Sequence, residues 1–187
     1  MKKKLFVLSG SSGVGKGTVI NGFLKRNPNY SLSISCTTRD KRPGEQDGVN
    51  YFYLTRDEFE QSIKNGEFLE WAEFAQNLYG TKRAFVDKCL NNGKDLILEI
   101  ETVGALKVKE QMPDAVLIFI APPSLEELEH RLRNRHTEDE ATIQKRLSAV
   151  REEIERAKKY DYTIVNDEVD SAILKLEEII KKEAANV

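Results

Sequence analysis

A glycine-rich segment between an apolar run and a helical pattern constrains the fold of this chain more than any other feature. The apolar run covers residues 4–9, the segment GSSGVGK covers residues 10–16, and an amphipathic stretch continues to residue 26. A strand, a glycine-rich turn and a helix in this order form a phosphate-binding loop, because backbone N–H groups and the helix N-terminus surround an anion. An ordinary strand–helix turn is the alternative, which the lysine that ends the segment disfavours.

The residues at the end of this segment indicate what the loop can bind. Lys16 can reach the β- and γ-phosphates of a nucleotide as a point charge. Gly17 stands where Ser or Thr usually follows this lysine, so Thr18 is the nearest hydroxyl for a Mg²⁺ ion. The residues expected to bind the nucleotide phosphates are Gly10, Ser11, Ser12, Gly13, Val14, Gly15, Lys16, Gly17 and Thr18.

Apolar strands alternate with helical patterns along most of the chain, which predicts an α/β fold. Residues 95–100 and 115–121 form two further apolar runs, residues 162–166 form a weaker one, and residues 169–184 form a final amphipathic helix. Fully apolar strands are typical of a parallel sheet with helices on both faces. We expect a core of this kind to comprise residues 1–33, 84–123 and 151–187.

Two segments interrupt this alternation. Residues 34–83 contain short strand patterns around one helix, whose start is marked by a capping box from Thr55 to Glu58. Residues 124–150 are helical and rich in arginine. The first segment predicts a small mixed α+β insertion with its own sheet, and the second predicts a charged helical segment.

Composition excludes several classes of protein. The chain has 187 residues, which suits one domain with an insertion, and 29 basic against 31 acidic residues give a net charge of -2. That balance provides no general attraction to nucleic acid or to an anionic membrane. The N-terminal apolar run is too short for a secretion signal, and Cys36 and Cys89 show no metal-binding spacing. We therefore expect a cytoplasmic protein without nucleic-acid or membrane partners.

A second phosphate site is indicated by the segment SISCTTRDKRPGEQDGVNYFY at residues 33–53. Arg39 and Arg42 precede a Pro43-Gly44 turn, and Tyr51 follows it. Two guanidinium groups beside a phenol can hold a phosphate group. A solvated basic turn is the alternative, which residue type alone favours.

The succession of motifs along nearly the whole chain resembles the guanylate kinase family. The phosphate loop is common to many nucleotide-binding proteins, but more specific motifs follow it: S-x-S-C-T-T-R-x-x-R-P-G-E-x-x-G-x-x-Y, F-L-E-W-A-E-F, Y-G-T, L-E-I-E, R-x-x-x-R-x-T-E and I-Q-K-R-L. The resemblance implies a P-loop nucleoside monophosphate kinase with a parallel-sheet core, a GMP-binding insertion at residues 34–83 and a helical lid at residues 124–150. It also implies phosphorylation of GMP and dGMP by ATP with Mg²⁺, through direct in-line transfer, in purine nucleotide metabolism and GMP recycling.

The resemblance divides the acceptor residues into two sets. The GMP phosphate would be held by Ser35, Arg39, Arg42, Tyr51 and Tyr79, and the guanine by Glu70, Thr81 and Glu101. Guanine presents the N1–H and N2–H₂ donors side by side with the O6 acceptor, so a carboxylate and a hydroxyl suit it. Glu101 follows a predicted buried strand, at the end where ligands bind in open α/β sheets. For Glu70 the residues alone favour an exposed strand carboxylate.

The resemblance also assigns roles in the lid. Arg131, Arg135 and Arg146 match the family's lid arginines. Arg135 and Arg146 would act with Lys16 and Arg39 on the transferred phosphoryl group, because this chemistry depends on positioning and charge neutralisation. Residues expected to contact ATP outside the loop are Arg131 and Asn166, the latter through adenine. A solvated helix face is the alternative for the arginines, and a turn residue is the alternative for Asn166.

Three positions depart from the family's pattern, and two other functions compete. Lys41, Val103 and His136 stand where the family commonly has proline, glutamine and glycine.

A phosphopeptide-binding module of the scaffold type is disfavoured by the retained Lys16. A kinase for another phosphorylated acceptor, such as a ribose bisphosphate, is disfavoured by the guanine set. Whether the chain forms a homo-oligomer is left open.

Overall fold

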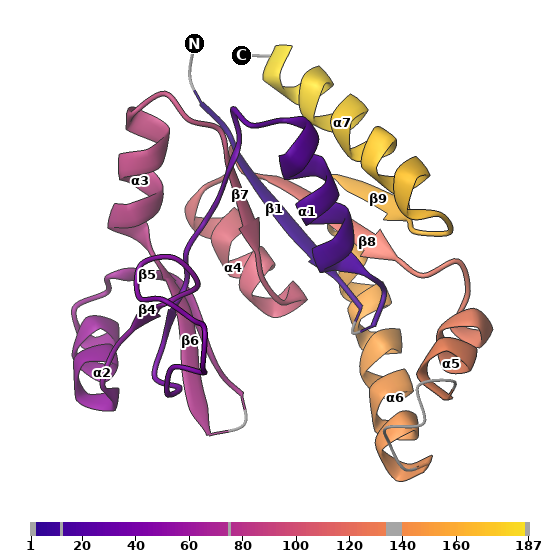
Figure 1. Cartoon of the computed structure of the whole chain (residues 1–187), viewed down its shortest axis with the longest axis horizontal. Helices are drawn as coiled ribbons and strands as arrows, with labels where there is room; N and C mark the ends of the chain where they lie inside the picture. Colours follow the sequence, from indigo (N-terminus) through magenta and orange to yellow (C-terminus); the bar gives the residue numbers. More distant parts are fainter. Residues whose placement is uncertain (1–2, 12, 75, 134–139, 186–187) are drawn as a thin grey trace.

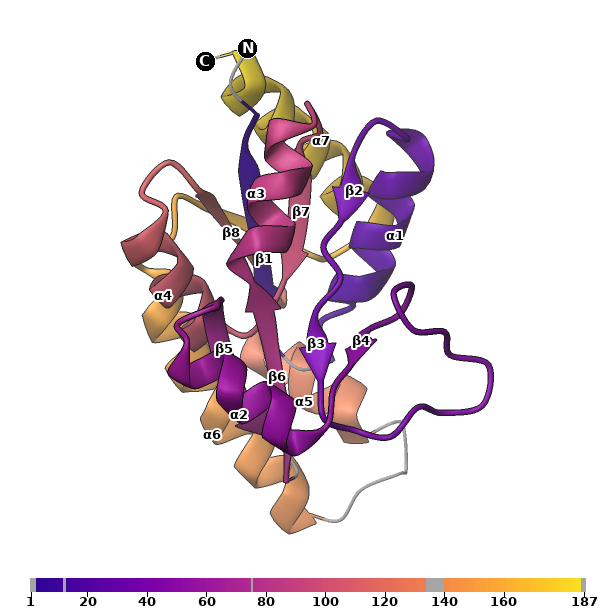
Figure 2. The ribbon, with the colours of Figure 1, turned by 90° about the vertical axis from the view of Figure 1, so that its left-hand side faces the viewer.

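The fold is built on two sheets, shown in the computed structural model of Figure 1. The structure describes residues 3–11, 13–74, 76–133 and 140–185. The large sheet has the strand order β2-β7-β1-β8-β9, and the small sheet has the order β4-β3-β6-β5. The small sheet with its helix, and the helix pair α5 and α6, lie beyond the same end of the large sheet (Figures 1 and 2). Both termini lie at the opposite end.

All strand pairs of the large sheet are parallel, as the apolar runs predict. Its strands are β1 (Leu5–Gly10), β2 (Ser31–Leu32), β7 (Leu96–Glu99), β8 (Val116–Ala121) and β9 (Tyr162–Val165). Every residue of the central strand β1 is buried. A strand that is covered on both faces has no polar alternation, which is why these segments read as continuous apolar runs.

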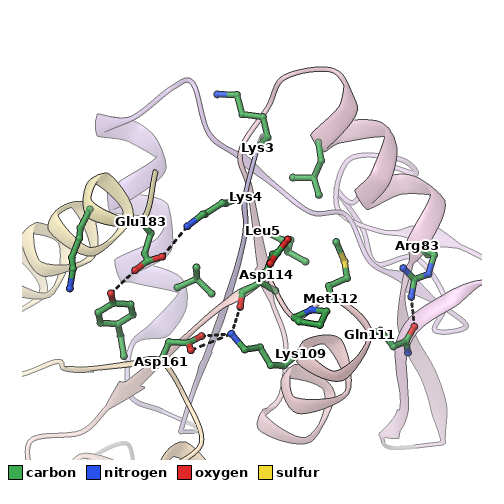
Figure 3. A pocket seen from close by; sticks show the side chains of 16 residues that line it. Lys3, Lys4, Leu5, Arg83, Lys109, Gln111, Met112, Asp114, Asp161 and Glu183 are labelled. Atoms are coloured by element: carbon green, nitrogen blue, oxygen red, sulfur yellow. Dashed lines mark hydrogen bonds and ion pairs between the residues drawn. The ribbon is translucent and has the colours of Figure 1, made fainter. Parts of the chain in front are cut away.

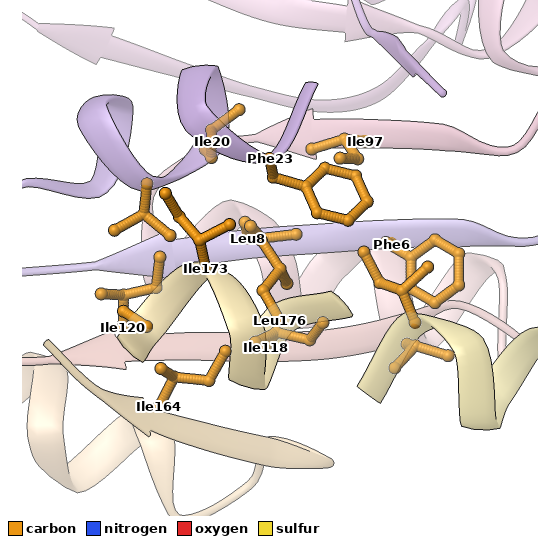
Figure 4. Packing of buried hydrophobic residues seen from close by; sticks show 14 of the residues in the cluster. Phe6, Leu8, Ile20, Phe23, Ile97, Ile118, Ile120, Ile164, Ile173 and Leu176 are labelled. Atoms are coloured by element: carbon orange, nitrogen blue, oxygen red, sulfur yellow. The ribbon is translucent and has the colours of Figure 1, made fainter. Parts of the chain in front are cut away.

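Helices cover both faces of the large sheet. Phe6 and Leu8 of β1 pack against α1 (Lys16–Arg26) and α7 (Val169–Ala185), as Figure 4 shows for residues such as Phe23 and Ile173. Leu5 and Val7 point to the other face, where α3 (Arg83–Asn91) and α4 (Thr102–Gln111) contribute to a second cluster. The period of two along β1 therefore divides the core into two layers. The predicted helix-covered parallel sheet is confirmed.

The small sheet forms the predicted insertion. Its strands are β3 (Cys36–Thr37), β4 (Phe52–Tyr53), β5 (Phe68–Phe74) and β6 (Asn77–Lys82), and its helix is α2 (Arg56–Lys64). The capping box at Thr55 and Glu58 is confirmed. Phe59 of α2 stacks on Phe68 of β5 with 4.3 Å between ring centroids. This separate apolar cluster gives the insertion a core of its own.

The charged segment forms two helices, α5 (Leu125–Arg133) and α6 (Glu140–Ala157). Ile143, Leu147 and Val150 of α6 form a small apolar cluster with Leu125 of α5. Helix α6 continues past residue 150 without a break. None of the helices that the structure describes combines the length and the apolar character that a membrane crossing requires.

Candidate functional site

The glycine-rich loop connects the carboxyl end of β1 to the N-terminus of α1. Gly15 caps α1 in the left-handed region, with φ of 88°, and its carbonyl accepts from the N–H groups of Thr18 and Val19 at 3.0 and 3.1 Å. The Val14 N–H donates to the Ser11 carbonyl at 3.1 Å, which closes the turn before the helix. Ser12 lies outside the described residues. The loop therefore has the strand–turn–helix context that a phosphate site requires.

Asn166 supports this loop from the end of β9. It is buried, and its Nδ2 donates to the Val14 carbonyl at 2.7 Å, although 152 residues separate the two in the chain. Its Oδ1 is buried and has no hydrogen-bond partner among the described residues. The structure thus gives Asn166 a contact that the sequence did not predict, and the expected adenine contact stays a prediction.

Two carboxylates lie near Lys16. Its Nζ lies 3.8 Å from Oε1 of Glu99, the last residue of β7. Glu153 of α6 is also near Lys16. Burial, and then the negative charge of Glu101, raise the pKa of Glu153 to about 7. The Ser11 hydroxyl and the positive charges of Lys16 and Arg156 oppose this rise. Oε2 of Glu153 is buried, and no described residue forms a hydrogen bond with it.

Sequence reasoning missed Glu99 and Glu153 as parts of this site. Glu99 stands in the motif L-E-I-E at the end of a predicted strand, so its place at the carboxyl edge was a usable signal. Glu153 lies in a run of charged helical residues with Glu152 and Glu155. Nothing local distinguishes it from its solvated neighbours, because only the packing of α6 makes it half-buried.

The residues expected to hold a second phosphate gather around β3 and β4. The Arg39 guanidinium carbon lies 5.5 Å from the centroid of the Tyr51 ring, and the Tyr51 and Tyr79 ring centroids are 6.1 Å apart. Ser35 precedes β3, and its carbonyl accepts from the Phe52 N–H at 2.9 Å. The solvated-turn alternative is wrong for Arg39, whose side chain is only 14% exposed.

Arg42 and Glu45, which follow Arg39 in the chain, differ in exposure: Arg42 is exposed and Glu45 is half-buried. Arg42 is exposed, as the solvated-turn alternative expects. The Arg39 guanidinium donates hydrogen bonds to Glu45. This contact is the largest cause of two changes: it lowers the pKa of Glu45 to about 2, and it raises the pKa of Arg39 above its ordinary value. The sequence shows Glu45 in the motif R-P-G-E, but its role was not predicted from the motif.

Glu70 and Thr81 form a buried polar pair between β5 and β6. The two residues are register partners in the small sheet, and the Thr81 hydroxyl donates to Oε1 of Glu70 at 2.7 Å. Glu70 is 7% exposed, so the exposed-carboxylate alternative is wrong. Burial raises the pKa of Glu70, which the Thr81 hydroxyl and the charge of Lys107 oppose. A buried acceptor of this kind suits a ligand that brings hydrogen-bond donors.

The small sheet links this pair to the phosphate region. Tyr79 and Thr81 are two residues apart on β6, so their side chains share one face of the sheet. Tyr79 lies beside Tyr51, and Thr81 bonds to Glu70. Arg39 and the tyrosines therefore lie near one end of this face, and the Glu70 carboxylate lies at the other. Glu101 is exposed and stands at the N-cap of α4, on the large sheet's side of the site.

The predicted lid arginines cannot be placed. Arg135 lies outside the described residues. Arg131 and Arg146 lie on α5 and α6, but their side chains are also outside what the structure describes. Their assigned roles stay predictions.

A metal site was expected at Thr18. Thr18 is exposed in the first turn of α1. Among the described residues, no three His, Cys, Asp or Glu side chains are grouped so that they could hold a metal by themselves. Mg²⁺ usually keeps several waters and binds through substrate phosphates with one or two carboxylates. The carboxylates near Lys16 fit that mode of binding better than a site made of protein ligands alone.

A cavity of about 1070 Å³ lies at the other end of the large sheet (Figure 3). It is lined by the first residues of β1, β8 and β9 and by surrounding lysines. Lys4 pairs with Glu183 at 3.0 Å and Lys109 with Asp161 at 2.9 Å. Lys4 and Lys109 are thus engaged by neighbouring carboxylates, and the cavity is separate from the glycine-rich loop.

Comparisons with known proteins agree on one family. Residues 2–183 match the family model described as guanylate kinase. A guanylate kinase from Oceanobacillus iheyensis is 52% identical over 179 residues, which are 96% of this chain and 87% of that protein. One from Clostridioides difficile is 49% identical over 186 residues, covering 100% and 91%. The crystal structure of guanylate kinase from Anaplasma phagocytophilum superposes with a TM-score of 0.75 at 34% identity, covering 97% of this chain and 86% of that chain.

Proposed function

The chain belongs to the guanylate kinase family, and we propose on this premise that it transfers the γ-phosphoryl group of ATP to GMP. The observation that carries the proposal is the buried Glu70–Thr81 pair on the small sheet, two residues along β6 from Tyr79, whose ring lies beside Tyr51 and its neighbour Arg39. A base reader and a phosphate clamp that lie next to each other suit a nucleoside monophosphate. The nearby phosphate loop suits a second nucleotide, which supplies the group that is transferred.

The transfer is a direct in-line displacement. An oxygen of the GMP phosphate attacks the γ-phosphorus of ATP, the bond from that phosphorus to the β–γ bridging oxygen breaks, and ADP leaves with the bond's electron pair. The acceptor is already an anion, so no general base is needed. Lys16 and the loop N–H groups stabilise the charge that develops on the phosphates.

Guanine recognition is assigned to the buried pair. The Glu70 carboxylate accepts from N1–H and N2–H₂ of guanine, and Thr81 holds the carboxylate in place through the bond to Oε1. Thr81 and Glu101 complete the set of base-reading residues. Adenine has an acceptor at N1, so AMP would leave the buried carboxylate opposite a lone pair. GMP is therefore preferred, and dGMP shares the same base.

The chain would work as three parts. We assign residues 1–33, 84–123 and 151–187 to the core, residues 34–83 to the GMP-binding insertion and residues 124–150 to the lid. The insertion and the lid close on the core when both nucleotides bind, which excludes water from the phosphates. Arg131, Arg135 and Arg146 would reach the ATP phosphates in that closed state, with Arg135 and Arg146 on the transferred group.

Mg²⁺ accompanies ATP in this proposal. The residues that would hold it are Thr18 and the carboxylates beside Lys16, together with the nucleotide phosphates. When bound, it would neutralise charge on the phosphate oxygens. The cytoplasmic location stays a prediction that cell fractionation can check, and light scattering can determine the oligomeric state, for which the sequence made no prediction.

The proposal is tested by ADP release in a coupled assay across GMP, dGMP, IMP, AMP, UMP and CMP. We expect rapid ADP release with GMP and dGMP and slow release with the others. A Lys16→Met variant provides the background rate. Equal rates with GMP and AMP would contradict the assignment of Glu70 as the base reader.

A further inference from the structure

We propose that Glu45 is a positioning residue of the acceptor phosphate site, whose carboxylate holds Arg39 and the turn at Arg42 in place before GMP binds. The inference rests on the proposed function, because it explains how the same GMP phosphate site is built. It adds a residue that does not touch the reacting atoms and acts through the arginines that do.

The carboxylate of Glu45 joins three separate points of one loop. Nη2 of Arg39 donates to Oε1 at 2.8 Å and to Oε2 at 3.0 Å. The backbone N–H of Arg42 and the hydroxyl of Tyr53 each donate to Oε2 at 2.8 Å. Four donated hydrogen bonds fix this carboxylate, whose side chain is only 18% exposed. An acid at a solvated turn has no need of such a set of partners.

These bonds orient the Arg39 guanidinium and use only some of its N–H donors. A guanidinium has five N–H donors. Nη2 is occupied by Glu45, and Nη1 donates once to the Asp40 carbonyl at 2.7 Å. Within the described part of the chain, the Nε–H and the second Nη1–H have no acceptor and are left for a ligand phosphate. The guanidinium carbon meanwhile lies 5.5 Å from the Tyr51 ring, at the expected phosphate position. Glu45 therefore sets the direction of a long side chain that otherwise samples many rotamers.

If only its charge mattered, Glu45 would weaken the binding of GMP instead of supporting it. Glu45 is an anion, and its low pKa of about 2 keeps it charged throughout the usual assay range. A negative charge beside a phosphate site weakens phosphate binding by simple Coulomb repulsion. Neutralising Glu45 should then tighten GMP binding if charge dominates and weaken it if positioning dominates. The sign of the effect separates the two explanations.

The small sheet offers a matched control. Glu67 pairs with Lys82 at 2.8 Å. The pKa of Glu67 is also lowered to about 2, and this contact is the largest cause. It directly precedes β5 and has no assigned role in the site. Glu67→Gln therefore removes one charge from the same insertion without changing a phosphate residue.

The experiment compares Glu45→Gln, Glu67→Gln and wild type by steady-state kinetics and by calorimetric titration with GMP and with guanosine. We expect Glu45→Gln to raise the KM for GMP by about tenfold or more, the size of one lost charge-assisted hydrogen bond. The KM for ATP and the affinity for guanosine should change less than about twofold, because neither involves the acceptor phosphate. Glu67→Gln should match wild type in all four measurements.

Specific outcomes overturn the inference. An unchanged or lowered KM for GMP in folded Glu45→Gln would show that the carboxylate does not position Arg39. If that variant does not fold, Tyr53→Phe removes one donor to Oε2 and changes no charge at neutral pH, and an unchanged KM for GMP would then be decisive against the inference. A wild-type protein that releases no ADP with GMP would instead refute the proposed function itself.

Discussion

Gly104 of α4 faces the carboxylate of Glu70 so closely that a Cβ at residue 104 would lie 2.9 Å from Oε2. The Thr81 hydroxyl donates to the other oxygen, Oε1, at 2.7 Å. The carboxylate is thus fixed between a strand of the insertion and a helix of the core. Because glycine has no side chain, residue 104 leaves the space that the Glu70 carboxylate, our proposed base reader, occupies.

We predict that Gly104→Ala lowers kcat/KM for GMP by at least about tenfold, because the new methyl group displaces Glu70 from its place. The folded state should remain stable, because alanine favours a helix over glycine by about 1 kcal/mol. Kinetics with a thermal unfolding scan checks both parts. Val103→Ala, at an exposed neighbour in the same helix, is the control and should keep wild-type kcat/KM.

Glu70→Gln should narrow the discrimination between GMP and IMP. Thr81 donates to Oε1, so glutamine should keep its oxygen there and turn its NH₂ group towards the guanine donors. The ratio of kcat/KM for GMP over IMP should fall by at least about tenfold, since a site built for a polar group rejects analogues strongly. A ratio equal to that of wild type would mean that Glu101 and Thr81 read the base without Glu70.

Lys16→Met should abolish turnover and leave GMP binding nearly intact. Lys16 is the first residue of α1, directly after the glycine-rich loop, whereas the proposed GMP residues lie mainly in the insertion at residues 34–83. Removing one preorganised charge from a phosphoryl-transfer site costs at least about 10² in kcat. A calorimetric titration with GMP checks the second part. Complete loss of GMP binding would show that the two nucleotide sites are not separate.

Glu153→Gln should flatten the pH dependence of stability. The folded state raises the pKa of Glu153 to about 7, so it holds a proton that the unfolded chain releases near the ordinary value of 4.5. The contribution of this group to the free energy of unfolding is therefore complete below that value and is lost as the pH rises to about 7. The depressed carboxyls Glu45 and Glu67 titrate below this window.

The measurement for Glu153 is the unfolding temperature from pH 5 to pH 8. Wild type should lose stability across this range relative to Glu153→Gln. Glu152→Gln, which changes an exposed neighbour, should follow the wild-type curve. Parallel curves for wild type and Glu153→Gln would mean that Glu153 is solvated rather than buried beside Glu101.

The sequence was informative wherever structure depends on local pattern. The apolar run of β1, the turn at residues 10–16 and the start of α1 are neighbours in the chain, so their order alone predicted the phosphate loop. The Thr55 capping box likewise predicted the start of α2, because a cap bonds to backbone groups within one turn. The parallel sheet followed from strands that lack polar alternation.

Only the tertiary structure decided which polar residues are buried and what they contact. Glu70, Glu67 and Glu73 look alike in the sequence, yet Glu70 alone of the three is buried, between Thr81 and Gly104. Asn166 reaches Val14 across 152 residues of chain, and Glu153 enters the site only because α6 packs beside the loop. Burial and long-range hydrogen bonds depend on how distant segments pack, and no local pattern of residue types records that packing.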